Sequence, residues 1–516
     1  MNSPLLGAVV VEALAACGVT DVVLSPGSRN APISLALHAA DAAGRIRLHV
    51  RVDERVAGFT ALGLAKGSGR VVAVVTTSGT AVANLAPAAM EARNAGVPLL
   101  LVTADRPSEL VGTGANQTAE QVGVFGTSTL GVVRLSSASG TVAGRSAGVQ
   151  RAHALASGVR TRRPGPVQLN VELGMPLVGP VPRVTVQAAR IAPSAPGPAV
   201  ALDGAETVVL VGDATPAVGA AARALAEGAG APLFAEPSSN ARSGPNAIAG
   251  YRLLLDGPSA ARIRRVVCFG HPTLSRPVNR LLGRDDIELV VVTDRADWSD
   301  VGHRAAVVAD AVTLAGQPAG WLEEWRALDR PSLVAVEAGL DRVAVVRAVV
   351  ASAGEGTNLF LGSSQTIREA DLVPIAARPA TTFSNRGTSG IDGTLATATG
   401  VALATGRPTT VLLGDLTLQH DVGALVRPPL EPAADVRVVV LHDDGGAIFH
   451  TLEQGAPEYA DAFERVFGTP QGVDLAAVGR ALGWVVSAPT TVQALAEQMS
   501  RPVSGAELVV CRVMRG

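Results

Sequence analysis

The sequence predicts an α/β protein of three domains, of which the first and third are similar to each other. The chain has 516 residues, too many for one hydrophobic core and typical of two to four domains. Continuous apolar runs alternate with alanine-rich segments, which is the pattern of parallel strands covered by helices on both faces. A fixed shift also superimposes the early runs on the late ones, which indicates an internal repeat.

The strands are predicted from short apolar runs between turn residues. These runs are 21–25, 71–75, 98–104, 207–212, 265–270, 288–293, 358–363, 409–414 and 436–441. An amphipathic helix is expected ahead of the first run. Two Pro/Ala-rich stretches, 192–200 and about 316–325, are interpreted as linkers. The predicted domains are therefore 1–180, 190–330 and 335–516.

The repeat is defined by Gly63 and Gly400, which lie 337 positions apart (400 − 63). The same shift carries Leu24 to Leu361, Val74 to Val411 and Val102 to Val439, always within a strand-like run. Ala, Gly and Val are common here, so some identities arise by chance. The ungapped succession of strand, turn and helix still predicts two similar domains, with a third between them.

Composition excludes several classes of protein. The chain is 47% hydrophobic and 17% charged, which is typical of a globular protein and not of a disordered one. A net charge of −2 gives no reason to expect a nucleic acid or an anionic membrane surface as partner. No apolar run is long enough to span a bilayer. Three widely separated cysteines suggest no disulfide framework, and we expect a cytoplasmic protein.

Polar residues follow the predicted strands, at the sheet edge where open α/β sheets bind ligands. Asp415 and Asp443 each follow a late strand and lie 28 positions apart (443 − 415). Two carboxylates and a glycine carbonyl from Gly445 would provide oxygen ligands for Mg²⁺, which phosphate and water usually complete. The alternative is that each aspartate caps the helix that follows it.

This spacing resembles the motif of thiamine-diphosphate enzymes, in which Gly-Asp is followed after about 25–30 residues by Asn or Asp before x-Gly. The sequence departs from that motif at Leu416, where many members have Gly, and at His442-Asp443, where many have two Asn. The resemblance implies thiamine diphosphate with Mg²⁺, or Mn²⁺ in its place. It implies cofactor contacts from Asp415, Leu416, Thr417, Asp443 and Gly445, and metal contacts from Asp415, Asp443 and Gly445.

Such an enzyme also needs a carboxyl group that bonds the pyrimidine nitrogen of the cofactor and so lets the ring accept the C2 proton. Glu54 precedes an apolar helix of the first domain and is the predicted catalytic acid. We expect a desolvated position at a domain interface, where its pKa can rise. The alternative is a charge cluster of Asp53, Glu54 and Arg55 at a helix N-terminus.

Further segments resemble one thiamine enzyme family more specifically, the 2-succinyl-5-enolpyruvyl-6-hydroxy-3-cyclohexene-1-carboxylate synthases of menaquinone biosynthesis. These segments are SPGSRNAP (25–32), DERVAGF (53–59), VTTSGTAVAN (75–84), ADRPSEL (104–110), GANQT (114–118) and SNRGTSGIDG (384–393). The middle domain matches less distinctly, through 235–244 and 270–278. The resemblance implies three Rossmann-like domains, decarboxylation of 2-oxoglutarate and addition of the acyl carbanion equivalent to isochorismate.

The two substrates together carry four carboxylates, and arginine binds carboxylate bidentately. By motif position the predicted substrate contacts are Ser28, Arg29, Arg106, Asn116, Gln117, Arg276, Ser364, Arg368 and Arg386. For each arginine the alternative is a surface salt bridge.

Apolar side chains complete the predicted site. By resemblance Ile391 bends the cofactor, and it lies at the repeat position of Glu54 (391 − 54 = 337). Ile448 beside the cofactor, with Phe449 and Leu452 beside the substrate, would form an apolar wall that favours loss of CO₂; the alternative is that these side chains belong to an ordinary hydrophobic core. The resemblance also implies a homodimer or homotetramer with active sites between subunits.

Two other functions stay open. An acetolactate-synthase-like 2-oxo acid decarboxylase or lyase would use the same cofactor. A nucleotide-binding regulatory protein is the alternative from another class, and the absence of G-x-G-x-x-G after any strand disfavours it.

Overall fold

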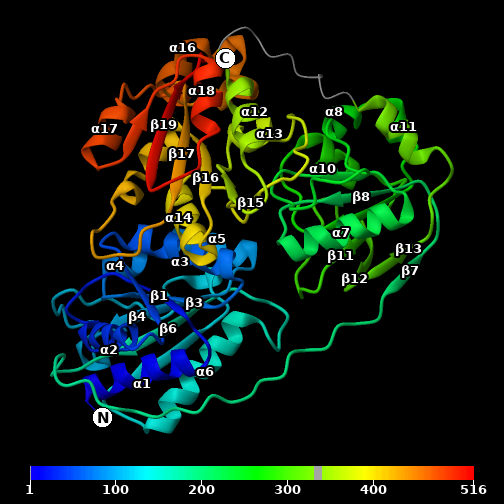
Figure 1. Cartoon of the computed structure of the whole chain (residues 1–516). Helices are drawn as coiled ribbons and strands as arrows, with labels where there is room; N and C mark the ends of the chain where they lie inside the picture. The colour runs from blue at the N-terminus through cyan, green and yellow to red at the C-terminus, as the bar shows by residue number, and fades with distance from the viewer. Residues whose placement is uncertain (1, 330–339, 516) are drawn as a thin grey trace. The chain divides into compact units, whose positions relative to one another are not determined.

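The computed structural model describes residues 2–329 and 340–515, and three large sheets organise them (Figure 1). The sheets have six, five and six strands, and neighbouring strands in each pair in parallel. All nine predicted runs are strands of these sheets. The prediction of an α/β protein with parallel sheets is confirmed.

The first sheet has the order β2-β1-β3-β4-β6-β5. Its strands are β1 (Asp21–Leu24), β2 (Arg47–Val50), β3 (Val72–Thr76), β4 (Leu99–Asp105), β5 (Val132–Ser136) and β6 (Pro166–Glu172). One core lies between this sheet and the helices α1 (Ser3–Ala16), α2 (Ala31–Ala42) and α6 (Val142–Ser157). The opposite side carries α3 (Glu54–Ser68), α4 (Thr80–Ala83) and α5 (Ala86–Ala95) (Figure 1).

Helix α1 differs from the amphipathic helix that the sequence predicts. Its side chains are buried on nearly all sides, from Leu6 through Val9, Val10 and Val11 to Leu14. The helix packs against both α2 and α6, so it has no wide solvent face.

The middle sheet has the order β12-β11-β10-β8-β9, and β7 (Val200–Leu202) pairs separately with β13 (Val312–Leu314). Its strands are β8 (Thr207–Val211), β9 (Leu233–Ala235), β10 (Arg265–Phe269), β11 (Glu288–Val292) and β12 (Ala305–Ala309). The helices are α7 (Pro216–Ala229), α8 (Tyr251–Leu254), α9 (Pro258–Ala261), α10 (Arg276–Leu282) and α11 (Trp321–Leu328).

The prediction of a linker at about 316–325 is wrong over its second half. Trp321 and Trp325 of α11 are buried in the core of the middle sheet. The Trp321 indole N–H donates to the Thr207 carbonyl at 2.8 Å, and Trp325 packs edge-on against Phe234. Two large aromatic side chains therefore bind this segment to the middle sheet.

The third sheet has the order β15-β14-β16-β17-β19-β18. Its strands are β14 (Asn358–Leu361), β15 (Thr381–Phe383), β16 (Thr409–Gly414), β17 (Val436–His442), β18 (Val485–Ser487) and β19 (Ala506–Arg512). The accompanying helices are α12 (Arg342–Ser352), α13 (Gln365–Ala370), α15 (Asp415–His420), α16 (Ala460–Phe463), α17 (Leu475–Ala481) and α18 (Val492–Met499). Helix α14 (Thr394–Thr405) lies between β15 and β16 along the chain and packs against α3.

The first and third sheets share one topology, which confirms that these two regions are similar. Numbered within its own sheet, each has the strand order 2-1-3-4-6-5. The shift of 337 carries β1 at 21–24 onto β14 at 358–361, and β4 at 99–105 onto β17 at 436–442. The repeat read from the sequence is thus a repeat of fold.

The two glycines that define the repeat lie against each other where α3 crosses α14. A Cβ on Gly63 would lie 2.0 Å from the Thr397 carbonyl oxygen, and a Cβ on Gly400 would lie 2.2 Å from that of Thr60. Thr60 and Thr397 are themselves 337 positions apart (397 − 60). Glycine therefore permits the same close backbone approach from both sides of the crossing.

The protein consists of two compact units, each built from several segments of the chain. Unit 1 contains 1–194, 387–406 and 421–434, and unit 2 contains 195–386, 407–420 and 435–516. The domain boundaries expected from the sequence stay predictions, and positions 330 and 335 lie outside the described residues. Among the described helices, none has the length and apolar character needed to cross a membrane.

Candidate functional site

In unit 2, the carboxyl ends of β16 and β17 bring Asp415 beside His442. Asp415 is buried at the first position of α15, directly after β16. Its Oδ2 lies 2.9 Å from His442 Nδ1 and accepts the Gly445 backbone N–H at 3.1 Å, while its Oδ1 accepts the Leu416 N–H at 2.6 Å. The strand register positions this carboxylate, because β16 and β17 are adjacent and parallel.

Asp443 lies at the same sheet edge with one oxygen unpaired. Its Oδ2 pairs with Arg342, which also contacts Glu369 at 2.8 Å. Its Oδ1 is buried without a hydrogen-bond partner in the described part of the chain. Burial raises the pKa of Asp443 to about 6; the charge of Arg342 opposes this rise, and the charge of Asp415 adds to it.

Electrostatically, this edge favours a cation, because two buried carboxylates repel each other. Within 2–329 and 340–515, no group of three or more His, Cys, Asp or Glu side chains is arranged to hold a metal ion. A divalent ion on Asp415 and Asp443 would therefore need further oxygen ligands from a bound molecule.

The turn after Asp443 depends on glycine. Gly445 has φ +150°, and a Cβ there would lie 2.0 Å from the Gly468 carbonyl oxygen. No larger residue fits this conformation and contact. The N–H of Gly445 donates to Asp415, which ties the turn to the carboxylate.

Apolar side chains follow this turn in the short helix η4 (Ala447–Thr451). Ile448, Phe449 and Leu452 are all half-buried. The Phe449 ring lies 5.6 Å from the ring of Phe467, centroid to centroid. Each residue of the predicted apolar wall is therefore partly exposed. Beside it, Leu416 is half-buried and Thr417 is buried in α15.

In unit 1, Glu54 begins α3 and is half-buried. The helix cap is Asp53, whose Oδ1 accepts the N–H groups of Arg55 and Val56 at 2.8 and 3.2 Å. Glu54 instead accepts the side-chain amide of Asn84 at 3.0 Å through Oε2. Asp53 caps the helix, so Glu54 is not needed as the cap.

Two arginines of unit 1 lie near each other at the carboxyl ends of their strands. Arg106 is buried and donates to the Ser78 hydroxyl, and Gln117 Nε2 donates to the Ser78 carbonyl at 3.0 Å. Arg29 donates to the Leu173 carbonyl at 2.6 Å, and its buried Nε has no partner among the described residues. Burial, followed by the charge of Arg106, lowers the pKa of Arg29. Two like charges with an unpaired donor favour an incoming anion.

The remaining predicted site residues of unit 1 are two substrate contacts, Ser28 and Asn116, and one cofactor contact, Ile391. Ser28 and Asn116 are exposed. Ile391 is half-buried ahead of α14, and its carbonyl accepts the Thr394 hydroxyl at 3.0 Å.

The predicted arginines of unit 2 fall into two classes. Arg386 is buried and Arg368 half-buried, and their hydrogen bonds run to neutral acceptors: Arg386 to Thr273 and the Ser363 carbonyl, Arg368 to the Ser364 carbonyl at 2.9 Å. Burial, with the charges of Arg386 and Arg252, lowers the pKa of Arg368. Arg276 instead forms an exposed ion pair with Glu453 at 2.7 Å, the arrangement expected of a surface salt bridge.

Comparison with known proteins adds to this geometry. Residues 5–124 match the family model "Thiamine pyrophosphate enzyme, N-terminal TPP binding domain". A 2-succinyl-5-enolpyruvyl-6-hydroxy-3-cyclohexene-1-carboxylate synthase from Kineococcus radiotolerans is 50% identical, over 99% of this chain and 96% of the relative. Synthases of the same name from Nocardioides sp. and Arthrobacter sp. are 46% and 45% identical, each over 98% of this chain and over 94% and 88% of the relative.

The chain belongs to the 2-succinyl-5-enolpyruvyl-6-hydroxy-3-cyclohexene-1-carboxylate synthase family. The family resemblance read from the sequence motifs is therefore confirmed, and the thiamine-dependent class agrees with the match at 5–124.

For this member of the synthase family, sequence reasoning missed several polar contacts at the strand ends. Ser78 holds both Arg106 and Gln117, and Asn84 holds Glu54, although both lie inside a motif already singled out. His442 pairs with Asp415. Arg342, which pairs with Asp443 from 101 positions earlier in the chain, had no sequence signal.

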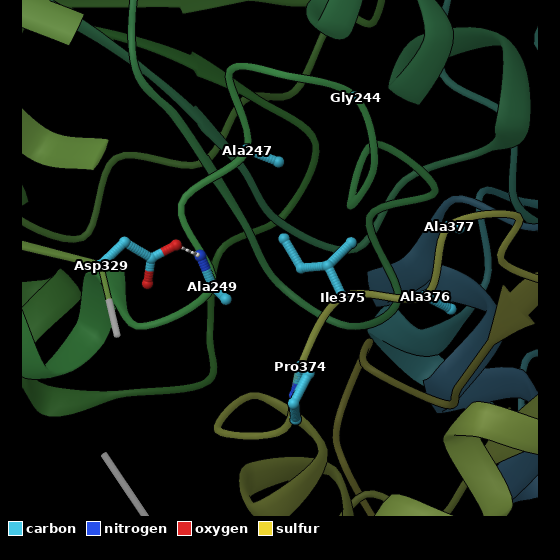
Figure 2. A pocket seen from close by; sticks show the side chains of 8 residues that line it. All are labelled: Gly244, Ala247, Ala249, Asp329, Pro374, Ile375, Ala376 and Ala377. Atoms are coloured by element: carbon cyan, nitrogen blue, oxygen red, sulfur yellow. Dashed lines mark hydrogen bonds between the residues drawn. The ribbon is translucent and has the colours of Figure 1, made fainter. Parts of the chain in front are cut away.

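A pocket of about 420 Å³ in unit 2 lies apart from all these residues. Figure 2 shows its lining, in which Asp329 accepts the Ala249 backbone N–H at 2.8 Å. The other lining residues are Gly244, Ala247, Pro374, Ile375, Ala376 and Ala377. No predicted site residue of the synthase lines it, so we do not assign the reaction to this pocket.

Proposed function

We propose that the chain decarboxylates 2-oxoglutarate and adds the succinyl carbanion equivalent to isochorismate, releasing CO₂. The product is 2-succinyl-5-enolpyruvyl-6-hydroxy-3-cyclohexene-1-carboxylate, an intermediate of menaquinone biosynthesis. The observation that carries the proposal is 50% identity over nearly the whole chain to a synthase named for that product.

Thiamine diphosphate, when bound, supplies the carbon centre on which a 2-oxo acid loses CO₂. In our proposal Asp415, Asp443 and the Gly445 backbone hold Mg²⁺ or Mn²⁺ against its diphosphate, and Leu416, Thr417, Ile391 and Ile448 contact the cofactor. Two features support this: the unpaired buried oxygen of Asp443, and the repulsion between the two carboxylates. A divalent cation relieves both.

Glu54 is the proposed catalytic residue. Its carboxyl would hold the proton that the pyrimidine ring nitrogen shares, and so set the ring to accept a proton. Asn84 orients this carboxyl through its 3.0 Å hydrogen bond, and Asp53 leaves it free by capping α3. The half-buried position allows a bound cofactor to complete its desolvation.

Substrate carboxylates are the proposed partners of Arg29, Arg106, Arg368 and Arg386. These four share a property: their hydrogen bonds run to hydroxyl or carbonyl groups, so none of them has a carboxylate as hydrogen-bond partner among the described residues. Ser28, Asn116, Gln117 and Ser364 would add neutral donors, with Phe449 and Leu452 as the apolar wall. Among the predicted arginine contacts, Arg276 is the one with least support, because it already forms an ion pair with Glu453.

We also propose that the enzyme acts in the cytoplasm as a homodimer or homotetramer with active sites between subunits. Sedimentation velocity of the cofactor-loaded enzyme tests the assembly, and a purely monomeric species with full activity would contradict it.

A coupled assay with 2-oxoglutarate, isochorismate, Mg²⁺ and thiamine diphosphate tests the reaction. Product formation that requires all four components is expected. CO₂ release from 2-oxoglutarate at the same rate without isochorismate would instead favour a simple decarboxylase or lyase.

A further inference from the structure

Two segments of the middle sheet meet beside Arg386, and apart from Arg276 neither has a role in the proposed reaction. Segment 235–244 begins at the last residue of β9, and segment 270–278 follows β10. Both belong to unit 2, as Arg386 does. The first also contacts β15, since Asn240 exchanges hydrogen bonds with the Thr382 backbone at 2.9 and 3.0 Å.

Glu236, in the first segment, anchors a turn of the second. The carboxyl is fully buried, and its Oε1 accepts the Leu274 backbone N–H at 3.1 Å. The Thr273 N–H also bonds this carboxyl. Glu236 forms no ion pair with a described residue, so its contribution runs through the backbone of the turn.

The same turn holds Arg386. The guanidinium donates to the Thr273 hydroxyl from Nη2 at 2.8 Å and from Nε at 3.2 Å, and to the Thr273 carbonyl at 3.1 Å. A further bond from Nη1 reaches the Ser363 carbonyl at 3.2 Å. Most of the bonds that orient Arg386 therefore depend on where Thr273 lies.

The protonation state of Glu236 contributes to the charge near Arg386. Burial, with the charge of Asp371, raises the pKa of Glu236 to about 8, against the opposing effects of the Leu274 N–H, Arg386 and the Thr273 N–H. The charge of Glu236 also contributes to the raised pKa values of Tyr251 and Cys268, for which burial is the main cause. A neutral Glu236 leaves the positive charge of Arg386 available to an anion at neutral pH.

We infer that Glu236 is a positioning residue, which fixes the Thr273–Leu274 turn and through it holds Arg386 ready for a substrate carboxylate. The inference rests on the proposed function, because it takes Arg386 as a substrate contact. In this way the middle sheet would contribute to the reaction, because Glu236 holds the turn and the turn holds Arg386.

The test compares three variants of the cofactor-loaded enzyme with the parent. Glu236→Gln keeps the shape and an oxygen acceptor, so at pH 7 we expect parental KM values. Glu236→Ala frees the Leu274 N–H, and Thr273→Val removes a hydroxyl that Arg386 uses. Both should raise the KM of one substrate roughly tenfold, the factor that about 1.4 kcal/mol represents, with kcat changed less than about threefold.

A pH series separates positioning from simple support of the fold. In the parent, loss of the Glu236 proton above about pH 8 places a negative charge beside Arg386, so the same KM should rise there. Glu236→Gln cannot lose that proton and should show no such rise. Glu288→Gln is the control, since Glu288 pairs with Arg265 at the other end of the same sheet, and it should retain the parental profile.

Backbone amide exchange supplies a readout that does not need turnover. Amide exchange at 270–278 should be faster in Glu236→Ala and parental in Glu236→Gln. Calorimetry should show weaker binding of the substrate whose KM rises, and only in Glu236→Ala. If Glu236→Ala does not fold, the kinetics of Thr273→Val and the pH series of the parent and Glu236→Gln test the inference instead.

Parental KM values in both Glu236→Ala and Thr273→Val would overturn the inference, as would an unchanged alkaline rise in Glu236→Gln. A parent chain that makes no product from both substrates would overturn the proposed function instead. Amide exchange and calorimetry would then still test the anchoring of the turn.

Discussion

The first and third sheets have the same strand order but carry different side-chain chemistry at equivalent strand ends. After β3 and β4 the first sheet places Ser78 and Arg106, and after β16 and β17 the third places Asp415 and Asp443. These are repeat positions, since 415 − 78 and 443 − 106 both equal 337. One fold thus carries an arginine after a strand of one sheet and aspartates after the equivalent strands of the other, which suits the anion and cation sites proposed for them.

The two helices that cross at Gly63 and Gly400 differ in the same manner at their starts. Glu54 begins α3, and its repeat counterpart Ile391 lies ahead of α14. An acid in one copy and an apolar side chain in the other suit the two tasks proposed for them, proton sharing and shaping the cofactor. The two copies therefore share a backbone arrangement, while the residues at their helix starts differ in polarity.

The largest expected effect comes from removing charge at the third sheet. Asp415→Ala should abolish Mg²⁺-supported binding of thiamine diphosphate, because the remaining carboxylate cannot offset diphosphate repulsion. Asp443→Asn should be milder, since an amide oxygen still ligates. Calorimetry checks both, and Ser78→Ala, at the repeat position of Asp415, should leave cofactor affinity parental. Unchanged affinity in Asp415→Ala would break the proposed contrast between the two edges.

Glu54→Gln tests the contrast between the helix starts. Folding and cofactor binding should largely survive, because the amide has the same shape and can still accept from Asn84. Proton exchange at the cofactor C2, followed by NMR after acid quench, should fall by the ~10²–10⁴-fold typical of general acid–base catalysis. Asp53→Asn, at the neighbouring cap, is the control with parental exchange. If Glu54→Gln also exchanges at the parental rate, another residue activates the cofactor.

Arg29→Ala and Arg106→Ala test the anion site of the first sheet. Each should raise the free energy of productive substrate binding by about 1.5–3 kcal/mol, the usual loss for a charge-assisted hydrogen bond, and spare cofactor binding. Steady-state kinetics with each substrate measures this. Arg45→Ala removes an exposed pair with Glu12 and should change little. Parental kinetics in both variants would mean that these arginines are structural.

The smallest effects concern the crossing that the two copies share. Gly63→Ala and Gly400→Ala should each destabilise the fold by about 1–3 kcal/mol, because the added Cβ meets a backbone carbonyl of the other helix. Similar losses in urea unfolding would sharpen the case for equivalence of the two helices. Gly228→Ala, in α7 with open space around it, should be neutral or slightly stabilising. If only one of these two variants lost stability, the two helices would not contribute equally to the contact at the crossing.

Where the sequence predicted the fold correctly, the signal was carried by residues close together in the chain. Apolar runs such as 98–104 and 436–441 report strands buried on both faces, and their order along the chain already implied parallel sheets. The errors also have physical causes. Trp321 and Trp325 lie in a segment whose Pro and Gly suggest a linker, and α1 is buried by helices that approach it from elsewhere in the chain.

The sequence by itself determined the fold class, the repeat, the family and the residues that follow the strands, because periodicity and motif spacing are properties of neighbouring residues. Only the tertiary structure decided the partners of those residues. Arg342 meets Asp443 across 101 positions, and Thr273 meets Arg386 across 113. Contacts at such separations depend on how whole elements pack, and they determine which charges are neutralised and which remain available to a ligand.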